Sequence, residues 1–426
     1  MREKESKHKV FCVAPFVNLW YRNSGGYYTM RPCCETRTDG FYWEEKNQET
    51  SKQNMFEKYW NSEYIKDIRN SMMENKPHKI CTDCINIEKK TGRSHRADYK
   101  RYLQDKDNSV EMNTEFGNQY KQALTLDYRP SNLCNLKCRM CGPGSSTEWA
   151  KEIDNHINTE YNKLNKMSDG TKVYYFDNDQ NRLYDKESNF DDQWKNLPLK
   201  HIRRAAFLGG EPLLQNETFE VMSYWAKNNN TNVRIQITTN GTNFTKKWID
   251  LFKQFDNIKI VLSSDGVDDT FDYIRTNANW SKVKENVTEL AKLKNIEFVY
   301  SYTIQMYNAF NLISILEFLR QWNIEHTYLA DFDCHFAERV QQTYLSTALL
   351  DNKDRDVIIS EIESYISKNP EMSRLGKEIM GILIADGDRT VTEAEKKYFS
   401  DYTAKLDKVR KTNLIDLDSR FRKYLI

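Results

Sequence analysis

The sequence contains no run of about 20 apolar residues, the length that a membrane-spanning helix needs. Its first nine residues contain no apolar segment of the kind that a secretory signal requires. Net charge is also nearly absent, because 63 basic residues face 62 acidic ones, so bulk charge gives no sign of a nucleic-acid partner. These absences predict a cytoplasmic protein with neither a membrane nor a nucleic-acid partner.

Internal repeats and low-complexity tracts are absent as well. The nine cysteines occur in a chain without an export signal, which favours free thiols or metal ligands over a disulfide framework. A chain of 426 residues is too long for one ordinary core, so two or three folding units are expected.

From residue 123 onward, short apolar strands alternate with amphipathic helices. Repeated β-then-α units predict an α/β fold with a parallel sheet, here a partial (β/α)6 TIM-like barrel. The expected strands are residues 123–128, 204–208, 233–238, 259–263, 298–304 and 327–331. The expected helices include residues 244–255, 283–293 and 312–322. A polar insertion at residues 151–200 interrupts the alternation, and residues 174–184 within it read as a hairpin.

The two ends of the chain show other patterns. Residues 11–32 alternate around a Ser-Gly-Gly tip and predict a β-hairpin, and residues 56–74 predict an amphipathic helix. Residues 101–120 read as a polar linker. After about residue 336 the chain is expected to be helical, with capping-box spacing from Thr392 to Glu395. The expected domains are therefore 1–115, 116–335 and 336–426.

Three closely spaced cysteines, Cys134, Cys138 and Cys141, follow the first expected strand. Their spacing bends a short loop around one soft-metal centre, and thiolates are the ligands that iron–sulfur clusters use. A cubane of four irons needs four ligands, so three thiolates leave one iron open to chelate a further molecule. A structural zinc site would need a fourth ligand, and the nearest histidine, His156, lies in a polar helix. Iron is therefore favoured.

Other unusual residues also follow expected strands, at the sheet edge where α/β folds bind ligands. Paired glycines let the backbone approach a ligand, and a glutamate beside them could accept a hydrogen bond from an ammonium group. Serine and aspartate can bond ribose hydroxyls, and an arginine can form a fork to a carboxylate. The candidate cofactor-binding residues are Gly209, Gly210, Glu211, Asn240, Ser263, Asp265 and Arg275.

The combination of these motifs resembles the radical S-adenosylmethionine (radical SAM) enzymes. The motifs are the cysteine loop, Gly-Gly-Glu-Pro at 209–212, the Asn-Gly turn, Ser-Ser-Asp-Gly and the following arginine. The resemblance covers residues 120–330. It implies that the open iron of a [4Fe–4S] cluster holds SAM, which is cleaved reductively to a 5′-deoxyadenosyl radical that abstracts hydrogen from substrate. Gln305 and Asn308 sit where relatives often carry polar residues. Met140 departs from the aromatic residue that many relatives have before the third cysteine.

Four N-terminal cysteines, Cys12, Cys33, Cys81 and Cys84, can close a complete tetrahedral set. They resemble the twitch domain, a shortened SPASM domain that holds an auxiliary [4Fe–4S] cluster, and here it precedes the barrel. Cys34 is the alternative to Cys33, and a zinc site is the alternative to iron. A fully ligated cluster could take an electron from a substrate radical. The expected cofactors are thus two [4Fe–4S] clusters and SAM.

The resemblance favours an oxidoreductase or modifying enzyme that acts on a peptide or protein. The alternatives are a dehydrogenase of a small alcohol or nucleotide-derived substrate, and a non-catalytic iron–sulfur binding or sensor protein. An intact SAM-binding set argues against the sensor. An electron donor such as flavodoxin or ferredoxin is expected as a partner. No residue is identified as a catalytic acid or base.

Overall fold

The computed structural model describes residues 10–24, 27–36, 41–44, 55–91, 94–96, 99, 122–156, 192–325, 336–340 and 342–425. The chain divides into two compact units. The first consists of Met1–Ser131, Asn189–Gln236 and Gln254–Asp256, and the second of Asn132–Ser188, Ile237–Lys253 and Asn257–Ile426. The expected linker at 101–120, the hairpin within 151–200 and the strand at 327–331 lie outside the described residues.

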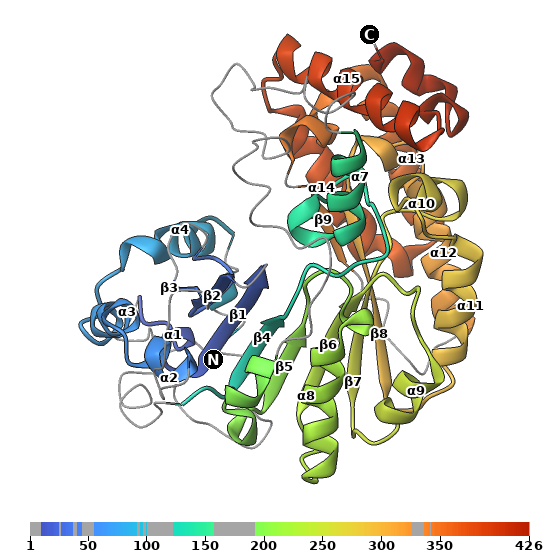
Figure 1. Ribbon diagram of the computed structural model, residues 1–426. Helices are drawn as coiled ribbons and strands as arrows, with labels where there is room; N and C mark the ends of the chain where they lie inside the picture. Colours follow the sequence, from blue (N-terminus) through green and yellow to red (C-terminus); the bar gives the residue numbers. More distant parts are fainter. Residues whose placement is uncertain are drawn as a thin grey trace. The chain divides into compact units, whose positions relative to one another are not determined.

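The first unit contains a mixed sheet (Figure 1). Strand β1 (Asn18–Ser24) runs antiparallel to β2 (Tyr27–Arg31), which runs antiparallel to β3 (Phe41–Glu44). On its other side β1 is parallel to β4 (Thr125–Arg129), and β4 is parallel to β5 (Arg204–Phe207). The expected hairpin is confirmed as β1 and β2. It continues the same sheet as the first strand of the α/β region.

The helix expected at residues 56–74 is two helices, α2 (Met55–Trp60) and α3 (Glu63–Met73). Ser62 separates them because its side chain accepts a hydrogen bond from the amide of Ile65 and caps α3. Further helices described in the first unit include α1 (Ala14–Val17), α4 (Thr82–Thr91) and α8 (Asn216–Lys227).

The division between the units falls within β6 (Arg234–Thr239), whose last residues belong to the second unit. There the strand order is β6, β7 (Ile258–Ser263), β8 (Ile296–Ile304) and β9 (Phe336–Arg339). The β7–β8 and β8–β9 pairs are parallel. The expected α/β fold with a mostly parallel sheet is confirmed.

Helices cover the second unit's strands (Figure 1). They are α7 (Thr147–His156), α9 (Lys246–Phe252), α10 (Asp268–Ile274), α11 (Trp280–Leu290) and α12 (Leu312–Glu325). Aromatic rings join α12 to β8, because Trp322 lies 6.1 Å from Phe298 and Phe318 lies 5.5 Å from Tyr300 between ring centroids. These contacts explain the apolar stripe at helical spacing in α12.

The C-terminal region is helical, as the sequence predicts. Its long helices are α13 (Asn352–Lys368), α14 (Ser373–Gly387) and α15 (Glu393–Arg410). Thr392 and Glu395 form the expected capping box at the start of α15. No helix among the described residues has the length and apolar character needed to cross a bilayer.

Candidate functional site

The three-cysteine loop lies between β4 and α7 in the chain, and its backbone is pinned to the segment that follows α10. The amide of Lys137 donates to the carbonyl of Thr276 at 2.9 Å, and the amide of Arg139 donates to the carbonyl of Ile274 at 2.8 Å. These bonds fix the loop against a second segment, so its shape does not depend on local turns alone.

The three thiols of this loop are gathered in one place. Cys134 and Cys138 are buried with Leu136 in a small apolar cluster, and Met140, Cys141 and Ala278 pack against it. Cys138 and Cys141 also meet directly: a hydrogen bond with the Cys141 thiol lowers the pKa of Cys138, and the same bond, together with burial, raises the pKa of Cys141. The three thiols of one loop therefore share one apolar cluster, and thiolates are the soft ligands that iron–sulfur clusters use.

Nitrogen donors approach two of the sulfur atoms. Arg275 Nη1 lies 3.7 Å from Cys138 Sγ, and Asn240 Nδ2 lies 3.9 Å from Cys134 Sγ. The amide of Leu136 also donates to Cys134 Sγ at 3.5 Å. Donors of this kind stabilise thiolate charge and tune the potential of an iron–sulfur centre.

Asp265 and Arg275, which the sequence suggests as cofactor-binding residues, form a buried ion pair with each other at 2.6 Å. Asp265 Oδ1 also accepts from the amide of Thr303, and its carbonyl accepts from Asn308 Nδ2. The expected polar residue Asn308 therefore supports Asp265, and Gln305 is bonded through its amide to Asn308. Arg275 connects this carboxylate to the Cys138 sulfur.

Asn240 links the turn after β6 to the cysteine loop. Its side-chain amide donates to Asn135 Oδ1 at 3.1 Å, and its own Oδ1 accepts from both the amide and the hydroxyl of Thr242. Gly241 follows with φ +78°, and a Cβ there would lie 2.6 Å from a methyl carbon of Leu262. The Asn-Gly pair is thus required by local geometry.

The Gly-Gly-Glu-Pro turn belongs to the first unit. Gly209 has φ +125°, and a Cβ there would lie 3.0 Å from the carbonyl oxygen of Ser131. Glu211 is buried and caps a short 3-10 helix, Pro212–Leu214, through the amide of Leu213. The absence of a side chain at Gly209 lets the Ser131 carbonyl lie close to the turn, and Ser131 directly precedes the cysteine loop in the chain. Ser263 ends β7 and is partly exposed.

Residues 128–319 match the family model of the radical SAM superfamily. This segment, a little under half of the chain, is therefore similar to a radical SAM domain. The match begins at the end of β4 and includes the cysteine loop, the glycine turn and the Asp265–Arg275 pair. Such a domain implies an enzyme that uses a [4Fe–4S] cluster and SAM.

Several solved structures resemble the chain at low identity. SuiB from Streptococcus suis bound to precursor peptide SuiA is 14% identical, with 82% of this chain and 71% of that chain covered and a TM-score of 0.38. The protein anSMEcpe with bound AdoMet is 20% identical, with 57% and 60% covered and a TM-score of 0.36. SuiB bound to S-adenosylmethionine is 13% identical, with 83% and 68% covered and a TM-score of 0.34. No curated protein matches the chain.

The donor set of the radical SAM domain fits the cluster that the superfamily implies. Three soft sulfur atoms come from one loop, and an arginine and an amide are aimed at two of them.

A second group of thiols lies in the first unit. One pocket is lined by four of the five N-terminal cysteines, together with four apolar and four polar side chains. Its lining residues are Val10, Cys12, Cys33, Glu35, Met72, Ile80, Cys81, Cys84, Ile85, His95, Arg96 and Tyr99. The four thiols predicted for the auxiliary site are thus brought together, although they come from separate segments.

Burial keeps these thiols protonated when no cation is near. It raises the pKa of Cys12 to about 12 and, with help from Cys84, the pKa of Cys81 to about 11. Burial and the neighbouring Cys12 also raise the pKa of Cys33. A metal centre would supply the positive charge that thiolates here require, so the donor set fits a closed metal site.

Cys34 points into a different environment. Its sulfur lies 4.0 Å from Glu35 Oε1, which in turn lies 3.1 Å from His95 Nε2. The hydrogen bond with Cys34, followed by that with Glu35, raises the pKa of His95 to about 11. Cys34, Glu35 and His95 each offer one possible ligand atom within 4.8 Å of the others, whereas Cys33 lines the pocket with Cys12, Cys81 and Cys84.

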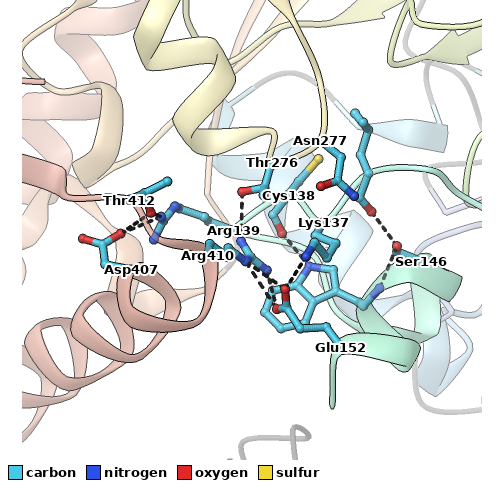
Figure 2. Close-up of polar contacts among 12 residues, drawn as sticks. Lys137, Cys138, Arg139, Ser146, Glu152, Thr276, Asn277, Asp407, Arg410 and Thr412 are labelled. Atoms are coloured by element: carbon cyan, nitrogen blue, oxygen red, sulfur yellow. Dashed lines mark hydrogen bonds and ion pairs between the residues drawn. The ribbon is translucent and has the colours of Figure 1, made fainter. Parts of the chain in front are cut away.

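Several residues that contact the cysteine loop were missed from the sequence. Lys137 and Arg139 lie between the cysteines and bind Glu152 and Asp407, respectively, and Arg410 joins Glu152 as well (Figure 2). Charged residues within the loop were a signal that partners exist. Nothing in the sequence indicates that two of those partners lie in α15.

Proposed function

We propose that this chain is a radical SAM enzyme that modifies a peptide or protein. Cys134, Cys138 and Cys141 would hold the SAM-binding [4Fe–4S] cluster, which with SAM supplies a 5′-deoxyadenosyl radical for hydrogen abstraction. The observation that carries the proposal is the gathering of three thiols on one buried loop of the radical SAM domain, with nitrogen donors directed at two sulfurs.

The chain's own residues have defined tasks in this proposal. Arg275 carries positive charge to Cys138, and its ion pair with Asp265 holds the guanidinium in place. Asn240 holds the loop through Asn135 and donates to Cys134. Burial of Cys134 and Cys138 excludes water from the sulfur ligands. Glu211, Ser263 and the paired glycines are proposed as contacts of the bound nucleotide.

An auxiliary [4Fe–4S] cluster on Cys12, Cys33, Cys81 and Cys84 is the second part of the proposal. It is supported by the pocket that these thiols line and by their mutual electrostatic interaction. A site with four thiols has no open position, which suits electron transfer from a substrate radical better than substrate binding. Reducing equivalents would come from a carrier such as flavodoxin or ferredoxin.

The test is anaerobic incubation of the fully loaded protein with SAM and a reductant. We expect 5′-deoxyadenosine to form, and we expect none from the variant in which Cys134, Cys138 and Cys141 are all alanine. Fully loaded wild-type protein that produces none would contradict the proposal and favour a binding or sensor role.

The substrate class has its own test. A peptide fraction and a small-molecule fraction of a cell extract, separated by size, are added to the same reaction. The proposal predicts that the peptide fraction accelerates 5′-deoxyadenosine formation and acquires a mass change. Acceleration by the small-molecule fraction alone would replace the peptide by a small alcohol or nucleotide-derived substrate.

A further inference from the structure

The carbonyl oxygens of the cysteine loop are held by side chains from two parts of the chain. Ser146 Oγ donates to the carbonyl of Leu136 at 2.6 Å, and Trp149 Nε1 donates to the carbonyl of Cys138 at 2.8 Å. Both donors lie immediately after the loop, at the start of α7 or just before it. They hold the loop from the side of the radical SAM domain.

The C-terminal region holds the next two carbonyls. The hydroxyl of Tyr402 on α15 donates to the carbonyl of Arg139 at 2.6 Å, and Gln342 Nε2 donates to the carbonyl of Met140 at 2.6 Å. Tyr402 is buried, so its bond is shielded from competing water. These contacts lie between the second and third cysteines.

Arg139 forms the first ionic link between the loop and α15. Its guanidinium is fully buried, lies 3.5 Å from the centre of the Tyr273 ring and donates to Asp407 Oδ1 at 2.6 Å. Asp407 Oδ1 also accepts from the hydroxyls of Tyr273 and Thr412. Figure 2 shows Arg139 directed toward Asp407 and Thr412. A buried charge with this many partners fixes its backbone position.

Arg410, the last residue of α15, forms the second link. It donates to both oxygens of Glu152, whose Oε2 also accepts from Lys137 Nζ of the loop at 2.6 Å. Its guanidinium packs 4.5 Å from the centre of the Trp149 ring, and its Nη1 donates to Thr276. Figure 2 shows Glu152 between the two cationic side chains.

We propose that α15 is part of the SAM-cluster site and that Asp407 and Arg410 are positioning residues for it. They hold the cysteine loop in the shape that presents its three thiols to one centre, Asp407 through Arg139 and Arg410 through Glu152 and Lys137. This inference takes from the proposed function only that Cys134, Cys138 and Cys141 are cluster ligands. The C-terminal helix is then required for cluster retention even though it supplies no ligand.

The test measures iron retention by the full-length, anaerobically loaded protein during challenge with a chelator. We expect the SAM-responsive cluster to be lost at least about tenfold faster in Asp407→Asn, and about threefold faster in Tyr402→Phe, which keeps the ring and removes one donor. The matched control is Asp401→Asn, an exposed carboxylate on the same helix that pairs with Lys397 at 3.4 Å. Its loss rate should equal that of the wild type.

A second readout separates positioning from general destabilisation. Removing positive charge beside a cluster disfavours its reduced, more negative state. The midpoint potential of the SAM-responsive cluster should therefore fall in Arg410→Met and stay near the wild-type value in Arg410→Lys, which keeps the charge. The inference would be overturned if the Asp407→Asn, Tyr402→Phe and Arg410→Met proteins fold, retain iron as the wild type does, and have its midpoint potential.

The outcome for the wild type distinguishes this inference from the proposed function. A wild-type chain that takes up no cluster on the cysteine loop contradicts the proposed function. Normal loading of the wild type with unaffected α15 variants contradicts the positioning role alone.

Discussion

The two thiol sites are built in opposite ways. The three-cysteine loop places all its thiols on one short stretch of chain, and nitrogen donors from Asn240 and Arg275 reach its sulfurs. The N-terminal pocket collects thiols from the segment before α1, the segment after β2, the short 3-10 helix Lys79–Cys81, and α4. The first site is specified by spacing, and the second depends on the packing of a whole unit.

The environments of the two sites differ as well. Burial keeps the pKa of Cys12 at about 12 among side chains such as Met72, Ile80 and Ile85. The pKa of Cys138 is lowered instead, first by its hydrogen bond with Cys141 and further by Arg275. A site of three thiols leaves one position for a further ligand, whereas a site of four thiols suits a closed centre that carries electrons.

The largest expected effect comes from emptying one site and leaving the other. Replacing Cys134, Cys138 and Cys141 with alanine should abolish 5′-deoxyadenosine formation and reduce the iron content from about eight to about four per chain, at four irons per cubane. Iron and sulfide analysis after anaerobic reconstitution measures this. Loss of all iron in this variant would show that the two sites are not independent.

The neighbouring cysteines Cys33 and Cys34 offer a matched pair for the N-terminal site. Cys33→Ala should lose the auxiliary cluster because a pocket thiol is removed, whereas Cys34→Ala should keep it because Cys34 is held by Glu35 and His95. Metal analysis of both variants, with iron and zinc counted separately, is the measurement. The reverse result would make Cys34 the ligand, and zinc in place of iron would exclude an auxiliary cluster.

Stability should depend on the ion pair that ties the cysteine loop to α15. Arg139 is fully buried, so Asp407→Ala leaves its charge without a partner and should lower the free energy of unfolding by about 3–5 kcal/mol. Asp401→Ala removes an exposed pair and should cost less than about 1 kcal/mol. Urea unfolding of the metal-free, full-length protein, followed by a spectroscopic probe in the second unit, measures both free energies. Equal changes in the free energy of unfolding for the two variants would show that the Arg139–Asp407 pair does not stabilise the fold.

The smallest expected effect is a difference in pH dependence between the sites without metal. A thiol reagent should label Cys138 at lower pH than Cys12, whose pKa is about 12. Because the pKa of folded Cys12 is raised above its ordinary value of 9.0, its contribution to stability is fully present below about pH 9 and is lost as the pH rises toward 12. Mass spectrometry of labelled peptides between pH 7 and 10 provides the comparison.

Much of the architecture was predictable because it follows local patterns. The strands β4 to β8 lie within two residues of their expected positions, since buried strands leave short apolar runs between helices. The capping box of Thr392 and Glu395 was predicted from spacing alone. The break at Ser62 was missed because the apolar spacing on either side of it continues a single helical pattern.

The contacts around the site were harder to predict. Asp265 and Arg275 were expected to face the cofactor, and their mutual ion pair depends on how α10 turns back after β7. The links from Arg139 to Asp407 and from Glu152 to Arg410 join residues far apart in sequence, and a single sequence contains no signal for such pairs. Spacing predicts which residues share a loop, but tertiary packing decides what surrounds it.

The most direct test of the central claim is the electron paramagnetic resonance spectrum of the reduced, iron-loaded protein before and after addition of SAM. An iron left open by three thiolates should bind SAM, so the account predicts a changed spectrum that disappears when Cys134, Cys138 and Cys141 are replaced. A fully loaded, reduced protein whose spectrum SAM leaves unchanged would contradict it.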